Sequence, residues 1–237
     1  MPFPGHAGAG ATIVRSYSPR KQATIKHSDL APPTILQVDG LSFAYPQRPL
    51  FADWSARVPA GITLLRGGDG SGKTTLLRLL AGDLPAAAGT LRIKQVHLGE
   101  QPDLYRRQVW RAGAQSEDVE QMTMDGYFAS EQRRHARFDA QALPFLLDGL
   151  GLAPHRHKQI FMLSTGSKRK VWLAAAFASG AALTLLDQPF AALDRASIDF
   201  VMVLLADAAK QSSRAWIVAH FEALGGVPLA RSIDLGD

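Results

Sequence analysis

A glycine-rich stretch with one lysine carries the clearest chemistry in this sequence. The pattern G-x-x-x-x-G-K-T runs from Gly67 to Thr74, after the apolar run Ile62–Leu65 and before leucines at helical spacing. A strand, a loop and a helix in this order let glycine backbone wrap around phosphate. Lys73 is expected to reach the β- and γ-phosphates, and Thr74 to place its hydroxyl on Mg²⁺. The pattern predicts a nucleoside triphosphate site; a chance glycine-rich turn is the alternative, which the flanking strand and helix disfavour.

A second stretch ends in a carboxylate where a metal ion would need one. Leu183–Asp187 is an apolar strand whose last residue is an acid. From such a position Asp187 could hold Mg²⁺ through water. The alternative is an ordinary buried strand followed by an Asp cap, so this stretch gains weight only together with others.

Composition narrows the class of protein. The chain has 237 residues, a net charge of +5 and no cysteine. This length suits one α/β domain, or a domain with an inserted subdomain. The absence of cysteine excludes disulfides, thiolate metal sites and thiol catalysis. The positive charge is explained by solvation, with nucleotide, nucleic acid or an anionic membrane surface as alternatives.

The first 33 residues differ from the rest. Gly, Ala, Ser and Pro dominate there, and Asp29 is the only acid among scattered Arg and Lys residues. We expect this segment to be a disordered basic tail, or to result from a start codon assigned upstream of the true one. It has the pattern of neither a secretory signal nor a clear transit peptide. The longest uncharged run, Val171–Leu186, is broken by Ser179 and Gly180 and is too short to span a bilayer comfortably. A membrane role would therefore require a partner.

Periodicity predicts the elements that must position these residues. Strands are expected at 35–45, 51–58, 62–65, 90–98, 109–113, 182–186, 215–219 and 231–235. The first two should be antiparallel and lie beside a nucleotide-binding core, giving a mixed sheet. Helices are expected after the glycine-rich loop, between 124 and 158 with breaks near 138–141 and 149–151, and at 168–179 and 197–210. The segment 99–107 is polar and is expected to be irregular.

Further motifs follow in a fixed order. Leu163–Ser167 precedes a basic run and a buried helix, Ala191–Asp194 follows the Asp187 strand, and Ala219-His220 ends the next apolar strand. Gln115 ends a short strand upstream. With these motifs the chain resembles the ATP-binding subunit of ABC transporters, from about residue 35 to the C-terminus.

The resemblance implies a role for each motif. The loop is similar to the Walker A motif and Leu183–Asp187 to the Walker B strand. Leu163–Ser167 resembles the ABC signature, and Ala191–Asp194 the D-loop. His220 is similar to the switch histidine, and Gln115 to the Q-loop glutamine that senses Mg²⁺ and faces the membrane partner, with Gln101 as the second choice. The residues expected to bind ATP are Tyr45, Gly67, Gly68, Asp69, Gly70, Ser71, Gly72, Lys73, Thr74, Thr75, Ser164, Gly166 and Asp194; those expected at the metal are Thr74, Gln115 and Asp187; and those expected in catalysis are Gln115, Gln188 and His220.

Two of these residues also have ordinary structural interpretations. Tyr45 is expected to stack on adenine, but a half-buried strand tyrosine is an almost equal alternative. A histidine at a strand end, such as His220, is usually structural, and the order of the motifs favours the switch.

The resemblance also implies a fold and an assembly. The fold is an α/β P-loop NTPase with a mixed sheet core, an antiparallel β subdomain and an α-helical subdomain inserted at about 116–180, all within 34–237. Ser164 and Gly166 would bind the γ-phosphate held by another subunit, so each chain carries two half-sites. Function would need a head-to-tail homodimer, or a heterodimer with another ABC subunit. The partners would be transmembrane permease subunits, and the chain would lie on the cytoplasmic face of the inner membrane.

Departures from the family pattern concern hydrolysis. Gln188 stands where the family usually has a glutamate that acts as general base, and an amide can orient water but cannot take its proton. Thr165 and Ser167 replace Gly and Gln of the signature. ATP binding is expected to be intact.

Three functions remain open at this stage. The first is an ATPase subunit that couples ATP and Mg²⁺ to transport, resembling small one-domain exporter subunits such as the cytochrome c biogenesis type. The second is a degenerate subunit that binds ATP and hydrolyses it poorly. The third is an ABC-type ATPase acting on nucleic acid, which is disfavoured because the chain shows neither long coiled coils nor paired nucleotide domains.

Overall fold

The computed structural model describes residues 32–46, 48–112 and 117–236, which belong to one compact unit beginning at Pro32. The expected tail therefore lies outside the described residues except for Pro32 and Pro33, whose carbonyl accepts a hydrogen bond from the Ala60 N–H at 2.9 Å. Among the described residues, none of the helices combines the length and apolar character needed to cross a membrane.

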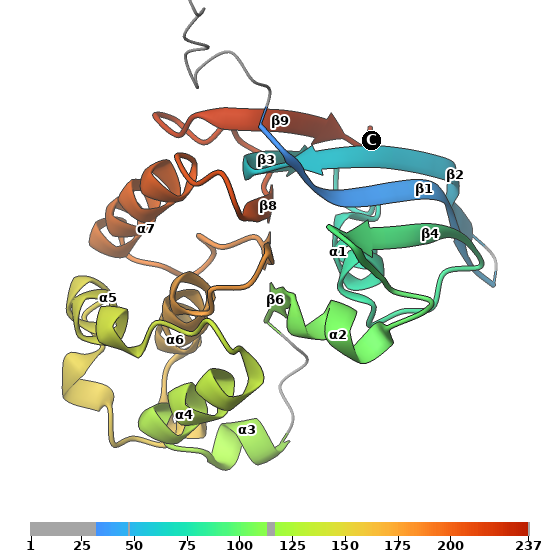
Figure 1. The fold of residues 1–237 in the computed structure, drawn as a ribbon. Coiled ribbons are helices and arrows are strands. Elements are labelled where there is room, and N and C mark those ends of the chain that lie inside the picture. Colours follow the sequence, from blue (N-terminus) through green and yellow to red (C-terminus); the bar gives the residue numbers. More distant parts are fainter. Residues whose placement is uncertain (1–31, 47, 113–116, 237) are drawn as a thin grey trace, which may run out of the picture. The chain divides into compact units, whose positions relative to one another are not determined.

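An antiparallel sheet contains the first strands of the unit (Figure 1). Its order is β2-β1-β4-β5, formed by β1 (Thr34–Tyr45), β2 (Arg48–Pro59), β4 (Ala88–Ile93) and β5 (Val96–His97). The antiparallel pairing of β1 with β2 confirms the prediction from their alternating pattern. The predicted single strand at 90–98 is wrong: Lys94 adopts a left-handed φ of 53°, and the chain turns back so that Val96 pairs with Ile93.

A second sheet is parallel throughout its described pairings. Its order is β6-β7-β8-β3-β9, formed by β6 (Val109–Arg111), β7 (Leu183–Asp187), β8 (Ala215–Ala219), β3 (Gly61–Arg66) and β9 (Leu229–Asp234). Parallel and antiparallel strands thus occupy separate sheets of the α/β fold, where the sequence suggested that they share one. The register aligns Leu65 and Asp187 with Ala219, which lies between them. The carboxyl ends of three strands therefore end at the same level.

Helices cover the parallel sheet on both faces. The described helices are α1 (Lys73–Ala81), α2 (Pro102–Arg107), α3 (Glu117–Gln121), α4 (Met124–Arg134), α5 (Leu143–Gly149), α6 (Thr165–Ala178) and α7 (Arg195–Ala208), with 3₁₀ turns η2 (Ala140–Ala142), η3 (Ala153–His155) and η4 (Ile160–Met162). Of these, α3, α4 and α5 pack on other helical elements rather than on the sheet (Figure 1). Apart from one isolated bridge between Thr123 and Gln159, the described part of 117–180 contains no strand. This segment is the one expected to form the helical subdomain.

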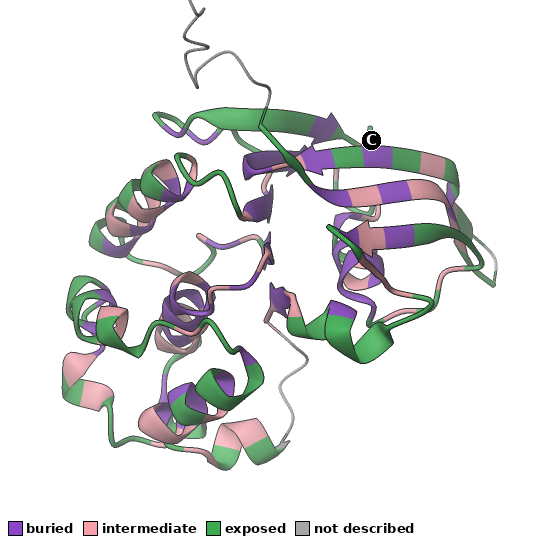
Figure 2. Ribbon diagram, in the orientation of Figure 1, coloured by how far each residue is buried: buried purple, intermediate pink, exposed green. Residues whose placement is uncertain are grey.

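Alternating side chains of β3 divide the core in two. Ile62 and Leu64 join the apolar cluster that contains α6 and α7, whereas Leu65 joins the cluster that contains α1 and β1. Neighbouring residues of a strand point to opposite faces, so one strand supports both layers. Figure 2 shows α1 mostly buried beside the sheet, and α6 divided between buried and intermediate residues. The loop between β3 and α1 is consequently held by two packed cores.

The segment 99–107, expected to be irregular, contains the helix α2. Pro102 occupies its first turn, where the missing N–H costs nothing. Tyr105 is completely buried, and its hydroxyl donates to the Leu80 carbonyl at 2.8 Å. Tertiary contact with the end of α1 thus stabilises a helix that the polar local sequence did not indicate.

A glycine in β4 provides a test of the close approach between β4 and β1. Gly89 has a φ of 99°, and a Cβ added there would lie 2.6 Å from the Gly40 carbonyl oxygen and the Leu41 Cα. We expect Gly89→Ala to lower the free energy of unfolding by roughly 2–5 kcal/mol, because backbone strain and overpacking add. Gly151→Ala, at a φ of 65° and with no atom of another described residue within 4 Å of the added Cβ, should cost only about 1–2 kcal/mol. Urea denaturation measures both; equal losses would contradict this account of the packing.

Candidate functional site

The loop between β3 and α1 is tightly wound. Gly67, Gly70 and Gly72 have φ angles of 147°, 78° and 96°, which side chains rarely allow. A Cβ on Gly67 would lie 2.4 Å from the Ser71 Oγ. Gly72 caps α1 without a side-chain hydrogen bond, so the first N–H groups of the helix keep their capacity to bind an anion.

Lys73 places its positive charge inside this loop. Its side chain is buried, and Nζ donates to the carbonyl oxygens of Gly67 and Gly68, both at 2.7 Å. These acceptors are neutral, and within the described residues Lys73 has no carboxylate partner. A buried charge without a counter-charge is costly. The ammonium group is therefore poised to pair with an anionic ligand.

Two residues 113 positions apart meet beside the lysine. Thr74 Oγ1, in the first turn of α1, donates to Asp187 Oδ2 at the end of β7, at 2.6 Å. Mg²⁺ prefers such oxygen ligands and commonly takes the rest of its coordination from phosphate and water. The described residues hold no group of three or more His, Cys, Asp or Glu side chains able to bind a metal. This pair could therefore hold Mg²⁺ only together with ligand oxygens.

A cavity of about 360 Å³ surrounds these groups. Its lining includes Tyr45, Asp69, Thr75 and Gln188 together with Gly70, Gly72, Lys73, Thr74 and Asp187. The Tyr45 hydroxyl lies 3.3 Å from the Thr75 Oγ1, and its ring packs edge-on against Phe43. Tyr45 keeps 42% of its surface exposed, which leaves area for a stacked base.

Arg48 belongs to this cavity and was not predicted from sequence. Its Nη2 donates to the Gly70 carbonyl oxygen at 2.9 Å, and the side chain lines the cavity with Leu50. Its only sequence signal is its position at the start of β2, and nothing local indicates that this end of β2 lies beside the loop. The fold alone brings the guanidinium to the site.

Gln188 and His220 face each other at the ends of β7 and β8. The Nδ1 of His220 lies 3.2 Å from the Oε1 of Gln188. Burial lowers the pKa of His220, while Glu222 partly opposes the shift, so the ring is neutral at neutral pH. The imidazole also packs against Phe190 and Phe221. The two residues form a neutral hydrogen-bonding pair beside Asp187.

The predicted signature lies outside the cavity. Ser164 caps α6, with Oγ accepting from the Ser167 N–H at 3.2 Å. Gly166 packs so closely on the next segment that a Cβ would lie 2.4 Å from the Ala192 carbonyl oxygen. Neither Ser164 nor Gly166 lines the cavity around Lys73. The chain therefore presents these residues separately from its own phosphate loop.

Asp194 links the predicted D-loop to α6. Its Oδ2 lies 2.5 Å from Lys170 Nζ, and its Oδ1 accepts from the Ser197 N–H at 2.9 Å, capping α7. Lys170 foremost, and then Ser197, hold the pKa of this carboxyl well below its usual range. Asp194 thus has a structural partner in this chain, and the predicted ATP contact remains a prediction.

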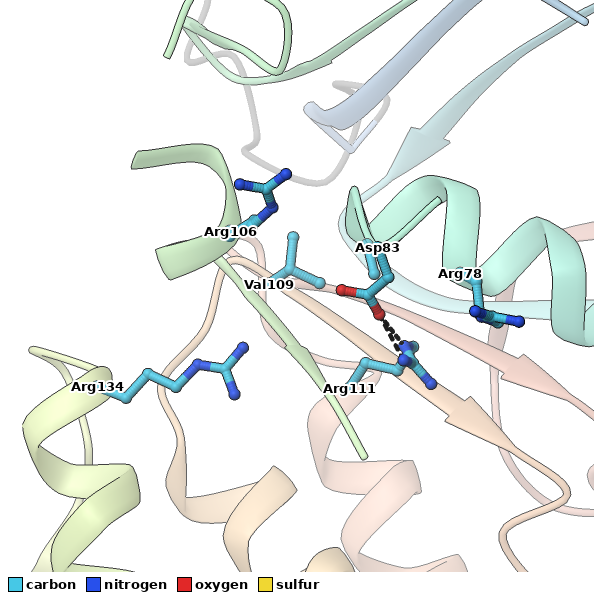
Figure 3. A pocket seen from close by; sticks show the side chains of 7 residues that line it. Arg78, Asp83, Arg106, Val109, Arg111 and Arg134 are labelled. Atoms are coloured by element: carbon cyan, nitrogen blue, oxygen red, sulfur yellow. Dashed lines mark hydrogen bonds and ion pairs between the residues drawn. The ribbon is translucent and has the colours of Figure 1, made fainter. Parts of the chain in front are cut away.

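The predicted Q-loop residue Gln115 lies outside the described residues. The second choice, Gln101, precedes α2 and does not line the cavity around Lys73. A separate hollow of about 560 Å³ lies beside β6, shortly before residue 113, and is rich in arginine (Figure 3). Asp83 pairs there with Arg111, whereas Arg106 and Arg134 reach toward the hollow from other elements. Sequence reasoning had not singled out this cluster.

Comparison with known families identifies the class of protein. The family model described as ABC transporter matches residues 53–191, more than half of the chain. The chain belongs to the ABC transporter family. As an ATP-binding subunit of this family it is an ATPase, and the fold class predicted from sequence is confirmed.

Curated ABC relatives match over most of their own length. The cytochrome c biogenesis ATP-binding export protein CcmA of Pseudomonas syringae pv. syringae is 32% identical, covering 85% of this chain and 95% of the relative. The manganese transport system ATP-binding protein MntB of Bacillus subtilis is 28% identical, covering 78% and 76%. A solved ATP-binding subunit of an ABC transporter superposes with a TM-score of 0.72 at 24% identity, covering 79% of this chain and 80% of that chain, which supports the fold.

Proposed function

We propose that this ABC subunit binds MgATP in the cavity around Lys73 and hydrolyses it there. The observation that carries the proposal is the 2.6 Å contact between Thr74 and Asp187, beside a buried lysine that has no carboxylate partner in the described part of the chain. Lys73 and the N-terminus of α1 would bind the β- and γ-phosphates, and Thr74 and Asp187 would orient Mg²⁺. Tyr45 would stack on the base.

Hydrolysis would proceed by in-line attack of water on the γ-phosphate. Gln188 lines the cavity next to Asp187, where that water would lie, and His220 contacts Gln188 from the end of β8. The amide of Gln188 can orient the water, but it cannot accept the proton. Most of the rate enhancement would then come from positioning and electrostatic stabilisation, and the rate of hydrolysis would be lower than with a carboxylate at position 188.

The separation of Ser164 and Gly166 from the cavity supports a head-to-tail dimer. Their helix N-terminus would close over the γ-phosphate bound by a second copy, or by another ABC subunit. A pair related by a two-fold axis makes both such contacts at once. The residues 34–237 would act as one ATP-binding domain with a helical subdomain at about 116–180.

The chain would work on the cytoplasmic face of the inner membrane through transmembrane permease subunits. The arginine-rich hollow beside β6 would be their docking surface, since β6 leads toward the predicted Gln115. The relatives are named for cytochrome c biogenesis export and for manganese transport. Similar ATP-binding subunits thus serve different cargoes, so the permease would determine the cargo. We place this chain with the small one-domain exporter type.

The metal role of Thr74 can be tested by removing one hydroxyl. Thr74→Val should raise the Mg²⁺ concentration for half-maximal ATPase activity by at least about tenfold, since a metal ligand is lost. Thr63→Val is the matched control, because the Thr63 hydroxyl is buried in β3 without a hydrogen-bond partner among the described residues. Its Mg²⁺ requirement should be unchanged. An unchanged requirement in Thr74→Val would contradict the assignment.

The role of Gln188 can be tested by restoring a carboxylate. Gln188→Glu should raise kcat by about a hundredfold, because a general base typically contributes 10²–10⁴. The KM for ATP should change little, since binding rests on Lys73 and the loop. Steady-state ATPase assays of the two proteins measure this. If wild type turns over as fast as the variant, the amide is not limiting.

A further inference from the structure

Arg169 connects the signature helix to the residue expected to orient water. It lies in α6, five positions after the cap Ser164, and is half-buried. Its Nη1 donates a hydrogen bond to the backbone carbonyl oxygen of Gln188. Arg169 also lines a hollow of about 130 Å³ together with Thr74 and Asp187. Arg169 therefore lies beside Thr74 and Asp187, the two residues proposed to hold Mg²⁺.

Gln188 adopts a conformation that needs external support. Its φ of 47° lies in the left-handed region, which a side chain disfavours, and the following Pro189 restricts it further. Its N–H donates to the Ala219 carbonyl at 3.0 Å. Its carbonyl accepts from Arg169 and also from the Ala191 N–H, at 3.2 Å, and its side chain meets His220. The backbone of this residue is thus held from β8 on one side, and from α6 and its own following turn on the other.

Other contacts hold the same two segments together. Gly166 packs on the Ala192 carbonyl, and Lys170 pairs with Asp194. Arg169 differs from these because its bond goes to Gln188 itself. The Nε of Arg169 is buried without a hydrogen-bond partner among the described residues. A buried donor left unpaired costs free energy, so the Nη1 hydrogen bond to Gln188 is made in spite of an unpaired Nε.

We propose that Arg169 is a positioning residue for ATP hydrolysis. It holds Gln188 in the left-handed conformation that directs the amide to His220 and the cavity. Because Arg169 lies on the helix that begins at Ser164, a shift of α6 moves this support. The signature helix can then control the water-orienting residue of its own chain. This inference rests on the proposed function of Gln188.

The test measures the ATPase kinetics of variants at Arg169 and the local order of the backbone at Gln188. Arg169→Met should lower kcat by about tenfold to a hundredfold, as expected for a misplaced catalytic group, with the KM for ATP within about twofold. Arg169→Lys keeps a donor and should recover part of the loss. Hydrogen exchange at the Gln188 amide, measured by NMR without ATP, should be faster in Arg169→Met, because the bond to Ala219 is no longer held.

Arg214→Met is the matched control, since Arg214 is also half-buried and donates to a backbone carbonyl, that of Ala181, at 2.8 Å. It should lower the melting temperature but leave kcat within about twofold at temperatures where the chain stays folded. In a Gln188→Ala background, Arg169→Met should cause no further loss of kcat.

A further loss in that background, or unchanged kcat and exchange in Arg169→Met, would overturn the proposal. If wild type failed to bind ATP at all, the proposed function would fall, and the exchange measurement alone would decide the role of Arg169.

Discussion

The parallel register of β3, β7 and β8 is the constraint on which the site depends. Leu65 and Asp187 both align with Ala219, so three strands end at one level. The loop after β3, the carboxylate of β7 and the histidine after β8 consequently converge, although they are far apart in sequence. In open α/β sheets, ligands bind at this carboxyl edge. A slip of one residue would separate Thr74 from Asp187 and reverse the faces that pack on α1 and α6.

The charges at this edge of the sheet then determine which ligand it favours. Lys73 is buried against two neutral carbonyl groups, and the N-terminus of α1 adds a partial positive charge. Both favour a phosphate anion. Gln188, which lines the cavity, and His220, which contacts it, are neutral, so under the proposed function the groups near the attacking water would offer hydrogen bonds without a strong base. Under the proposed function the site would therefore combine strong phosphate binding with weak proton transfer, because position 188 is an amide rather than a carboxylate.

The sequence was sufficient to predict those elements whose local pattern of apolar residues agrees with their burial in the fold. The apolar runs of β3, β7 and β8 are buried on both faces, and glycine spacing marks the loop, so these elements were predicted well. Prediction from sequence failed at α2, because a hydrogen bond from Tyr105 to another element stabilises a polar segment. It also failed at 90–98, because the chain turns at Lys94. The contacts of Arg48 and Arg169 also escaped prediction. Each guanidinium bonds a backbone carbonyl distant in sequence, and such acceptors have no residue type to recognise.

The central claim is that one chain holds two halves of different ATP sites. Sedimentation velocity of the full chain, with and without saturating ATP and Mg²⁺, tests it most directly. Slow hydrolysis should preserve the closed state, so the account predicts a monomer without nucleotide and a dimer with MgATP. The Lys73→Met variant should stay monomeric because it no longer binds ATP. The Gly166→Ala variant should also stay monomeric, because its Cβ would displace the Ala192 carbonyl, 2.4 Å away. A wild-type chain that binds MgATP yet stays monomeric, or a Gly166→Ala chain that dimerises normally, would contradict the account.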